Sequence, residues 1–600
     1  MEPSVVFVGV DVGAESSKVV LGPRQGCDIV RNEVGGHTTP TVISLSGDVP
    51  QQPRPLGTKK SNPNKNTVYH LNRLLPDELR SDGTDLLQAF YTFSRVGDGM
   101  IENLEYNGEE PKSFSAAALL GMLLGKLQQN VKATLQRQQG DTSSSNNNSL
   151  SFALACPSDL STAAQQELLD AAYAAGIDSI QLVDRNVAYQ ATYSRKFPER
   201  LDKYVLIVDM GHTDTSVSVI GPAKKDEQEQ GGEEAKKETE EEEEVLPFMT
   251  VLASERQKGL GAGSVDVRLW NHFQSTHAGL ATLTPNSRGG QRLLASMSKL
   301  KHLLSQLPEG NVTVENVGKD DADVSLEASR SMLVELCKEE VQAMTALIEK
   351  VVASAGIGID QLHSVEVVGG GCRMPWVKDV LEKATQKTLS HTLDDTSAAL
   401  GAALIGEQVS PMGILARRAP EEEPTERQKA LRAAEEKMAK LDEELQLRSA
   451  TLNQMESHIL GLRSAKHEEH GDLLPAELFT YLDTMEDWLF SPEADEAGYE
   501  ELLAKWQEVQ DKTGELSKAY KDAMETDRKA KESEMEAEAK QAQKEREGDE
   551  NEGDEEGHDN RRLPKKRRME IVMKNKNEGG ELFSDGNFSK LHQRFIMELI

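Results

Sequence analysis

The sequence predicts an α/β domain with two lobes over residues 1–408, followed by a bundle of helices and a charged tail. From residue 5 to about residue 408, apolar runs of strand length alternate with helical patterns, which is typical of α/β layers. An apolar strand that ends in Asp-x-Gly occurs twice, in residues 5–13 and 204–211. After residue 425 the apolar residues follow a heptad period, which is typical of packed helices.

The overall charge argues against one broad class of function. The chain of 600 residues carries 68 lysines and arginines against 101 aspartates and glutamates, a formal net charge of -33. Such an excess of acid disfavours general binding of nucleic acid, whose phosphates need basic partners. The length leaves room for about three or four domains, each with its own core.

Cysteine usage and hydropathy indicate the compartment. The four cysteines form no CxxC pair and no metal-ligand spacing, which fits a reducing compartment without disulfides. No apolar stretch reaches the length of a membrane span, and the first residues lack the basic start of a signal peptide. We therefore expect a cytoplasmic or nuclear protein that does not bind membranes.

Short apolar runs predict the buried strands of residues 1–408. They cover residues 150–156, 180–183, 204–209 and 365–368. A helix is expected over residues 162–175, after the first of these runs. Two low-complexity segments interrupt the pattern, residues 140–149 and residues 223–244, and we interpret both as surface loops.

The two Asp-x-Gly stretches suggest a pair of phosphate turns. Asp11 and Gly13 end the first stretch, and Asp209 and Gly211 end the second. A glycine lets a phosphate approach the backbone amides, and an aspartate at the end of a strand is a suitable oxygen ligand for hydrated Mg²⁺. Each turn alone is as often a plain hairpin as a binding site. Their repetition roughly two hundred residues apart favours two duplicated lobes, each with one phosphate turn.

A third glycine turn follows the strand predicted at residues 365–368. Gly369 and Gly370 precede Arg373 and a further helical pattern. Glycine allows the backbone to approach a nucleoside closely, and an arginine side chain can stack on a base. The order of the three turns therefore favours a nucleotide between the two lobes.

The same stretches carry a family resemblance that covers nearly all of residues 5–408. The segments VGVDVG, VLIVDMGHTDTSVSVI, LGAGSVDVRLWNHF and VEVVGGGCRMPWVKDVL occur in family order. They resemble the nucleotide-binding domain of the seventy-kilodalton heat-shock chaperone family, which has the actin-like ATPase fold. The large, hundred-and-ten-kilodalton branch and its endoplasmic-reticulum relatives are the most similar, and the lack of a signal sequence favours the cytosolic branch.

The resemblance implies a site for ATP and Mg²⁺. Asp11 and Asp209 would hold the hydrated Mg²⁺ and position water, while Gly13 and Gly211 would cradle the phosphates. Around the adenosine, the resemblance implies Lys301, His302, Ser305, Gly369, Gly370, Arg373 and Asp395. His302 stands where the family usually has a basic residue, and its imidazole would stack on the base.

Several positions depart from those of an active ATPase of this family. Ala14 and Glu15 replace a threonine pair in the first phosphate turn, and residues 213–216 (TDTS) differ from the expected second turn. Asn72 stands at the position of a lysine near the γ-phosphate, and Arg185 stands at that of a glutamate. Phosphoryl transfer depends on positioning and on cations around the γ-phosphate. We therefore expect ATP to be held, with weak or no hydrolysis.

The second half of the chain lacks the pattern of a peptide-binding β-sandwich. Residues 409–424 are expected to be a linker that leads directly into a helical bundle over residues 425–530, which resembles a chaperone lid. The two heptad series of its first helix hold Leu431, Met438, Leu445, Leu452 and Ile459, and Ala434, Leu441, Met455 and Leu462. Arg448 interrupts the second series, which favours an intramolecular bundle over a coiled-coil dimer.

Residues 531–600 are predicted to be a charged, largely disordered tail. A basic cluster at residues 561–568 (RRLPKKRR) is a candidate nuclear-localisation signal or, alternatively, a solvated cluster that balances its acidic neighbours. Residues 588–600 have helical spacing and would dock on the body of the protein or bind a partner.

Three functions are compatible with this pattern. The first is an ATP-binding co-chaperone, a nucleotide exchange factor for a partner heat-shock chaperone of the same superfamily. The second is an ATP-dependent chaperone that folds or holds unfolded proteins, and the third is a scaffold that binds no nucleotide. Intact glycine turns beside altered catalytic positions, together with a retained lid, favour the first.

Overall fold

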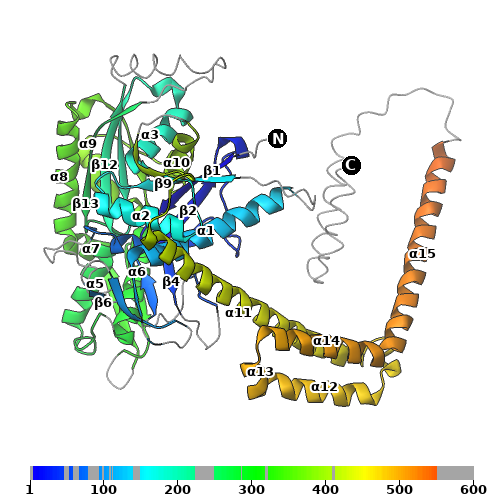
Figure 1. Ribbon diagram of the computed structural model, residues 1–600. Helices are drawn as coiled ribbons and strands as arrows, with labels where there is room; N and C mark the ends of the chain where they lie inside the picture. Colours follow the sequence, from blue (N-terminus) through cyan, green and yellow to red (C-terminus); the bar gives the residue numbers. More distant parts are fainter. Residues whose placement is uncertain are drawn as a thin grey trace. The chain divides into compact units, whose positions relative to one another are not determined.

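The computed structural model describes residues 5–45, 53–58, 66–78, 94–96, 100–106, 110, 112–139, 149–222, 249–285, 287–317, 322–408 and 413–550. These residues fall into two compact units, which divide between Ala450 and Thr451. The first unit holds two large β-sheets and the helices around them, and the described part of the second unit is helical (Figure 1).

Lobe I of the first unit is built on a six-stranded sheet with the order β18-β10-β9-β1-β2-β3. The strands are β1 (Val5–Val12), β2 (Ser16–Leu21), β3 (Thr39–Pro40), β9 (Ser149–Cys156), β10 (Ile180–Asp184) and β18 (Ile414–Arg418). The central strand β1 pairs in parallel with β9 and antiparallel with β2. Its apolar residues Val6, Val8 and Val10 are buried, so the strand that carries Asp11 is fixed in the core of the lobe.

Lobe II is built on a five-stranded sheet with the order β13-β12-β11-β16-β17. The strands are β11 (Tyr204–Met210), β12 (Asp214–Gly221), β13 (Thr250–Lys258), β16 (Leu362–Val368) and β17 (Leu389–Ser390). Numbered within each lobe by chain order, both sheets contain the sequence 3-2-1-4-5, as β3-β2-β1-β9-β10 and β13-β12-β11-β16-β17. This repeated topology confirms the predicted duplication, and it gives Asp11 and Asp209 equivalent places.

Two helices, α3 (Arg185–Lys196) and α10 (Ser397–Glu407), pack between the sheets of the two lobes. Their apolar residues share one core cluster with residues of β9, β11 and β16. The helices approach so closely that a Cβ on Gly401 would lie 1.8 Å from the carbonyl oxygen of Ala188. The small residues of α10 therefore set the spacing of the lobes.

In lobe I, α1 (Ala116–Gln139) and α2 (Thr162–Ala174) share one core cluster with the strands of the sheet. In lobe II, α8 (Lys338–Ser354) packs on β12 and β13, and α9 (Pro375–Thr385) packs beside α8 (Figure 1). The helices α5 (Ala262–Thr276), α6 (Arg288–Gln306) and α7 (Arg330–Leu336) pack with one another and with the small sheet of lobe II. Small sheets complete the unit: β4 (Val42–Ser44) with β5 (Thr67–Tyr69), β6 (Ser94–Val96) with β7 (Met100–Leu104) and β8 (Lys112–Phe114), and β14 (Glu309–Val314) with β15 (Val324–Ser329).

The segment predicted to be a linker, residues 409–424, is in part a strand of lobe I. Within it, β18 pairs antiparallel with β10, from Ile180 opposite Arg418 to Val183 opposite Ile414. The Arg418 guanidinium is buried and donates to the carbonyl oxygens of Asp178 and Glu422. Edge pairing satisfies the backbone of this segment, so the linker interpretation is wrong for residues 414–418.

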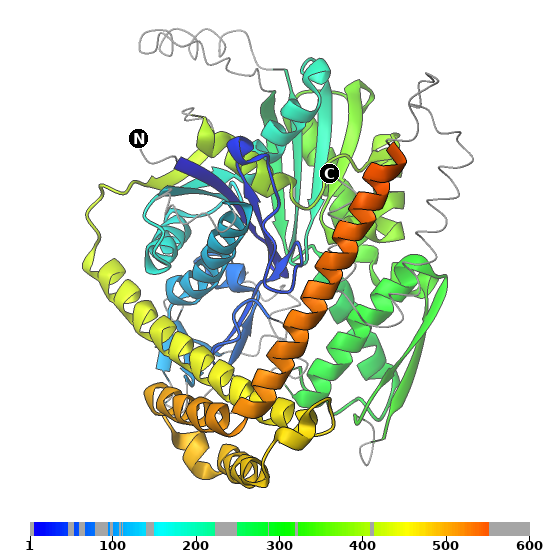
Figure 2. The same ribbon diagram turned by 90° about the vertical axis from the view of Figure 1, so that its right-hand side faces the viewer.

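Helix α11 (Glu426–Ala465) begins shortly after β18, and its first half packs on lobe I (Figure 2). Leu431 and Met438 pack against the core of this lobe. The Arg427 guanidinium reaches Glu167 and Asp170 on α2. The first part of the predicted heptad series therefore serves a lobe–helix contact.

The second unit is a helical bundle, as predicted. The second half of α11 packs with α12 (Ala476–Leu489), α14 (Tyr499–Leu516) and α15 (Lys518–Glu550), and α13 (Pro492–Glu496) is a short connecting helix. The buried core of this unit contains Met455, Ile459, Leu478, Leu482 and Val509. Apolar residues at heptad spacing on one face of each helix account for this core.

The boundary predicted between bundle and tail lies too early. Helix α15 continues to Glu550, whereas residues from 531 onward were expected to be disordered. This stretch is rich in Lys, Glu and Ala, which are strong helix formers, and pairs such as Lys540 with Glu536 stand four residues apart. A high density of charged residues therefore does not by itself indicate disorder in this segment.

Several predicted segments lie outside the described residues. They are residues 140–148 and 223–244 of the two loops, the basic cluster at residues 561–568, and residues 588–600. Within the described part of the chain, no helix combines the length and the apolar character that a membrane span requires.

Candidate functional site

The two Asp-x-Gly stretches form equivalent hairpin turns at the ends of β1 and β11. In turn A (residues 13–16) the amide of Gly13 donates to the carbonyl oxygen of Ser16 at 3.2 Å, and in turn B (residues 211–214) the amide of Gly211 donates to that of Asp214 at 2.9 Å. The same hydrogen bond in both turns shows that the two lobes present the same local structure. Asp11 and Asp209 lie two residues before these glycines, at the ends of the central strands.

The third glycine turn lies directly against turn B. Gly369 has a φ of 83°, and a Cβ there would lie 2.4 Å from the carbonyl oxygen of Met210 and 2.7 Å from Oδ1 of Asp209. Only glycine fits this left-handed conformation and close approach without strain. A Cβ on Gly370, in contrast, would meet no atom within 4 Å of the described structure. This part of the turn therefore leaves room for a ligand.

Helix α3 brings two side chains to the aspartates that precede turns A and B. Arg185 and Tyr189 lie one helical turn apart and share a face of the helix. The Arg185 guanidinium lies 3.0 Å from Oδ1 of Asp11, and the Tyr189 hydroxyl donates to Oδ2 of Asp209 at 2.9 Å. Both aspartates are therefore engaged by this single helix.

The electrostatics of this cluster favour a permanent positive charge between two carboxylates. Burial opposes the charge of Arg185, but the carboxylates of Asp11 and Asp209 raise its pKa above the ordinary value. Burial raises the pKa of Asp209, and this effect outweighs the opposing charge of Arg185. The guanidinium thus stays charged and compensates a site that collects negative charge.

The residues expected around the adenosine divide into two groups. Lys301 is buried, and its Nζ atom pairs with Oδ2 of Asp266 at 2.7 Å and with the carbonyl oxygen of Ala262 at 2.9 Å. This ion pair holds α6 against α5, so the ammonium group of Lys301 has a structural role. The side chains of the other group are His302, Arg373 and Asp395, which are exposed, and Ser305, which is half-buried and donates to the carbonyl oxygen of Lys301.

The position expected to hold a γ-phosphate lysine carries no positive charge. Asn72 lies in the short 3-10 helix η2 (Leu71–Leu74), and its Oδ1 atom is buried without a hydrogen-bond partner among the described residues. Nearby, Glu15 of turn A faces His70 and His212. A carboxylate near the expected γ-phosphate opposes the stabilisation that phosphoryl transfer requires.

Ion pairs connect β13 of lobe II with lobe I. Arg256 lies 2.6 Å from Glu78 and 2.9 Å from Asp159, and the side chains of Arg256 and Glu78 are 4% and 3% exposed. Lys258 lies 3.1 Å from Glu78 and donates to the carbonyl oxygen of Asp77. These interlobe pairs hold the lobes together near the turns.

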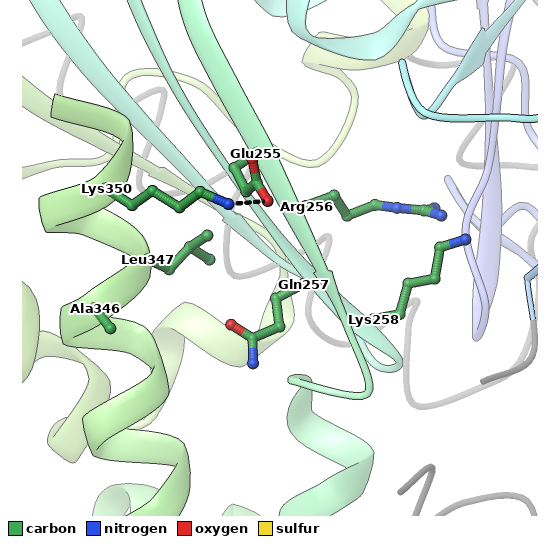
Figure 3. A pocket seen from close by; sticks show the side chains of 7 residues that line it. All are labelled: Glu255, Arg256, Gln257, Lys258, Ala346, Leu347 and Lys350. Carbon is green, nitrogen blue, oxygen red and sulfur yellow. Dashed lines mark hydrogen bonds and ion pairs between the residues drawn. The ribbon is translucent and has the colours of Figure 1, made fainter. Parts of the chain in front are cut away.

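The alternation of side chains along β13 explains this arrangement. Arg256 and Lys258 point toward lobe I, whereas Glu255 points toward α8 and pairs with Lys350 at 2.6 Å (Figure 3). A pocket of about 430 Å³ opens on this α8 side of the strand and is lined in part by Leu347. The pocket lies between β13 and α8 of lobe II.

The site fits a nucleotide better than it fits a magnesium ion. Gly13, Gly211 and Gly370 preserve backbone turns without side chains, as phosphates and a nucleoside need. Asp11 is paired with Arg185, and Asp209 accepts a hydrogen bond from Tyr189. The guanidinium offsets the charge of one of the two carboxylates, and both carboxylates already have a partner, so they fit an additional Mg²⁺ at the same place poorly.

The duplicated sheets and the three glycine turns define a two-lobed nucleotide-binding domain of the actin-like class. The profile of the Hsp70 protein family matches residues 7–224 and 247–415, and the chain belongs to this family. Proteins of this family bind ATP with Mg²⁺.

The relatives are of the large, Hsp110-like type, which confirms the predicted resemblance. A heat shock protein homolog of Naumovozyma castellii is 28% identical over 417 residues, which are 67% of this chain and 56% of that protein. Heat shock protein 88 of Dictyostelium discoideum is 25% identical over 417 residues, 68% of this chain and 49% of that protein. Heat shock 70 kDa protein 16 of Arabidopsis thaliana is 26% identical over 415 residues, which are 68% of this chain and 50% of that protein. The chain thus spans about half the length of these relatives.

Sequence reasoning missed three residues that shape the site. Tyr189 contacts Asp209, and Arg256 with Glu78 joins the lobes. The spacing of Tyr189 four residues after Arg185 was the available signal, because residues i and i+4 share a helix face. Nothing local indicated the pairing of Arg256 with Glu78, which stand far apart in the sequence.

Proposed function

We propose that this protein is an ATP-binding co-chaperone that accelerates nucleotide exchange in a partner chaperone of the Hsp70 family, with weak or no ATP hydrolysis of its own. The observation that carries this proposal is the ion pair between Arg185 and Asp11. It places a fixed cation between the two phosphate turns, where hydrolysis needs a mobile hydrated metal and an attacking water.

ATP acts in this proposal as a structural ligand. A ligand that contacts turns A and B and the third glycine turn stabilises the arrangement in which both lobes contact it. The pairs of Arg256 and Lys258 with Glu78 favour the same closed arrangement. The closed domain, together with the helical bundle, would then hold the nucleotide domain of the partner and open its cleft.

An exchange assay tests the proposed role. A partner Hsp70 is loaded with a fluorescent ADP analogue, and its release is followed after excess ATP and micromolar amounts of the full chain are added. We expect release to accelerate at least about tenfold, a barrier change of about 1.4 kcal/mol. Unchanged release at these concentrations would contradict the exchange role.

Thermal unfolding distinguishes this proposal from a scaffold that binds no nucleotide. Asp11 is paired with Arg185, and Lys301 is paired with Asp266. Because these side chains already have partners within the protein, a scaffold that binds no nucleotide is the second candidate. Melting curves are recorded with ATP, with ADP and without nucleotide. A ligand that binds only the folded state must raise the melting temperature, so an unchanged curve would support the scaffold.

A further inference from the structure

Three side chains with metal-binding groups meet at the boundary of the two lobes. They are Glu15, His70 and His212, and one ligand atom of each lies within 4.8 Å of the others. The Oε1 atom of Glu15 lies 3.8 Å from Nδ1 of His70 and 3.6 Å from Nε2 of His212. The two imidazole rings are stacked, with centroids 4.9 Å apart and planes inclined by 12°.

Each residue of this group is held by a defined turn. Glu15 belongs to turn A, His212 belongs to turn B, and His70 follows β5 directly. His70 has a φ of 54°, in the left-handed region that a non-glycine residue seldom adopts. Backbone conformations of this kind cost about 1–3 kcal/mol and persist where the surrounding structure requires them, often at functional sites.

We propose that Glu15, His70 and His212 form a site for a transition-metal ion of the Zn²⁺ class. Two imidazoles and one carboxylate are a ligand set of zinc sites that keep an open fourth position. Zinc bonds of about 2.0–2.2 Å in tetrahedral geometry need ligand atoms roughly 3.3–3.5 Å apart. The rings are stacked, so binding requires them to rotate until their nitrogen atoms converge, and Nδ1 of His70 must exchange its contact with the carbonyl oxygen of Ala14, at 3.3 Å, for the metal ion. Mg²⁺ prefers oxygen ligands alone and is not expected to compete.

The group is accessible to solvent and joins residues of both lobes. The side chains of His70 and His212 are 13% and 17% exposed, whereas that of Glu15 is 40% exposed, so the group opens to solvent on the side of the carboxylate. Glu15 and His70 belong to lobe I, and His212 belongs to lobe II. A bound metal ion would therefore link the two lobes. This inference does not depend on the proposed exchange function.

Metal titration of the full chain tests the site. Zn²⁺ is titrated against a chromophoric chelator, and Co²⁺ is used as a second probe because its visible absorption reports tetrahedral ligands. A second group, Glu469, His470 and Asp527, lies in the helical unit, so every protein carries His470→Gln. In this background we compare the parent with His212→Gln and Glu15→Gln. The control is His363→Gln, which changes an exposed histidine on β16.

We expect the parent and the His363→Gln control to bind one Zn²⁺ tightly and to give an intense Co²⁺ spectrum. His212→Gln and Glu15→Gln should weaken Zn²⁺ binding about a hundredfold or more, since each removes a direct ligand. Addition of about 5 mM Mg²⁺ should leave the Zn²⁺ affinity unchanged, because Mg²⁺ does not compete for imidazole ligands. Equal Zn²⁺ affinity in all four proteins, with circular dichroism showing that all are folded, would overturn the proposal.

Discussion

The guanidinium of Arg185 lies 3.0 Å from the carboxylate of Asp11 and offsets its negative charge, close to turns A and B. This arrangement predicts that ATP binding depends little on magnesium at Asp11 and Asp209. We expect the ATP affinities in Mg²⁺ and in EDTA to differ by less than about tenfold, or about 1.4 kcal/mol. Isothermal calorimetry under the two conditions measures this difference. A loss of all detectable binding in EDTA would contradict the prediction.

The same ion pair makes a prediction about stability. Arg185→Leu leaves Asp11 and Asp209 without a compensating charge, and breaking a buried pair commonly costs about 3–5 kcal/mol. The double variant Arg185→Leu/Asp11→Asn removes one of the two carboxylate charges and should recover part of this loss. Urea unfolding of the parent, both single variants and the double variant gives the coupling energy. Simple addition of the two single effects would mean that the pair is not coupled.

Substitutions of two neighbouring glycines should affect ligand binding and stability differently. A Cβ on Gly370 would meet open space, so Gly370→Val should change the free energy of unfolding by less than about 0.5 kcal/mol and still obstruct a nucleoside. Gly369→Ala should destabilise the domain itself by about 1–3 kcal/mol, because its φ of 83° and the carbonyl of Met210 exclude a side chain. Fluorescent-ATP binding and urea unfolding are measured for both. Full ATP affinity in Gly370→Val would remove this turn from the nucleotide site.

The pairing of Glu78 with Arg256 predicts how stability depends on pH. Burial pushes the pKa of Glu78 upward, but Arg256 and Lys258 hold it below its ordinary value of 4.5. The folded state therefore favours the carboxylate, and this contribution is present above pH 4.5 and is lost as the pH falls through the lower pKa of the folded state. Glu78→Gln should lower the free energy of unfolding by about 3 kcal/mol at neutral pH. The loss should become progressively smaller as the pH falls below the ordinary pKa of glutamate.

Urea unfolding between about pH 3 and pH 7 checks this pH dependence. Glu327→Gln is the matched control, because Glu327 is an exposed residue of β15. Its free energy of unfolding should follow that of the parent at every pH. A constant difference between Glu78→Gln and the parent over the whole range would show that the charge of Glu78 is not responsible.

The fold could be predicted largely from local patterns, whereas the partners of charged side chains could not. The Asp-x-Gly turns end apolar strands, and both features are visible within about ten residues of sequence. In contrast, Lys301 was expected beside the adenosine and lies in a buried pair with Asp266. Which way such a side chain turns depends on the packing of α5 against α6, which no local pattern contains.

The heptad pattern of α11 shows a second limit. Leu431 and Met438 follow the same period as Ile459, yet the first two pack on lobe I and the third packs in the helical bundle. A period fixes which face of a helix is apolar, but it does not identify what covers that face. The predicted bundle was therefore correct for the second half of α11 and incomplete for the first.

One buried arginine of lobe I pairs with two carboxylates of α11. The Arg54 side chain is 1% exposed and lies 2.8 Å from Glu435 and 2.6 Å from Asp442. Burial opposes its charge, but the two carboxylates raise its pKa above the ordinary value. Arg54→Met should therefore cost about 3–5 kcal/mol in this contact, because it leaves two carboxylates near the lobe without a cation.

Hydrogen exchange followed by mass spectrometry localises that loss. In Arg54→Met, amides of residues 426–450 should exchange at least about a hundredfold faster, as expected when about 3 kcal/mol of local stability is removed. Lys440→Met is the matched control on the same helix, since the Lys440 side chain is 78% exposed and lies 4.0 Å from Glu444. Its exchange should match that of the parent. If Arg54→Met also exchanges like the parent, the apolar contacts of Leu431 and Met438 hold the helix without the ion pairs.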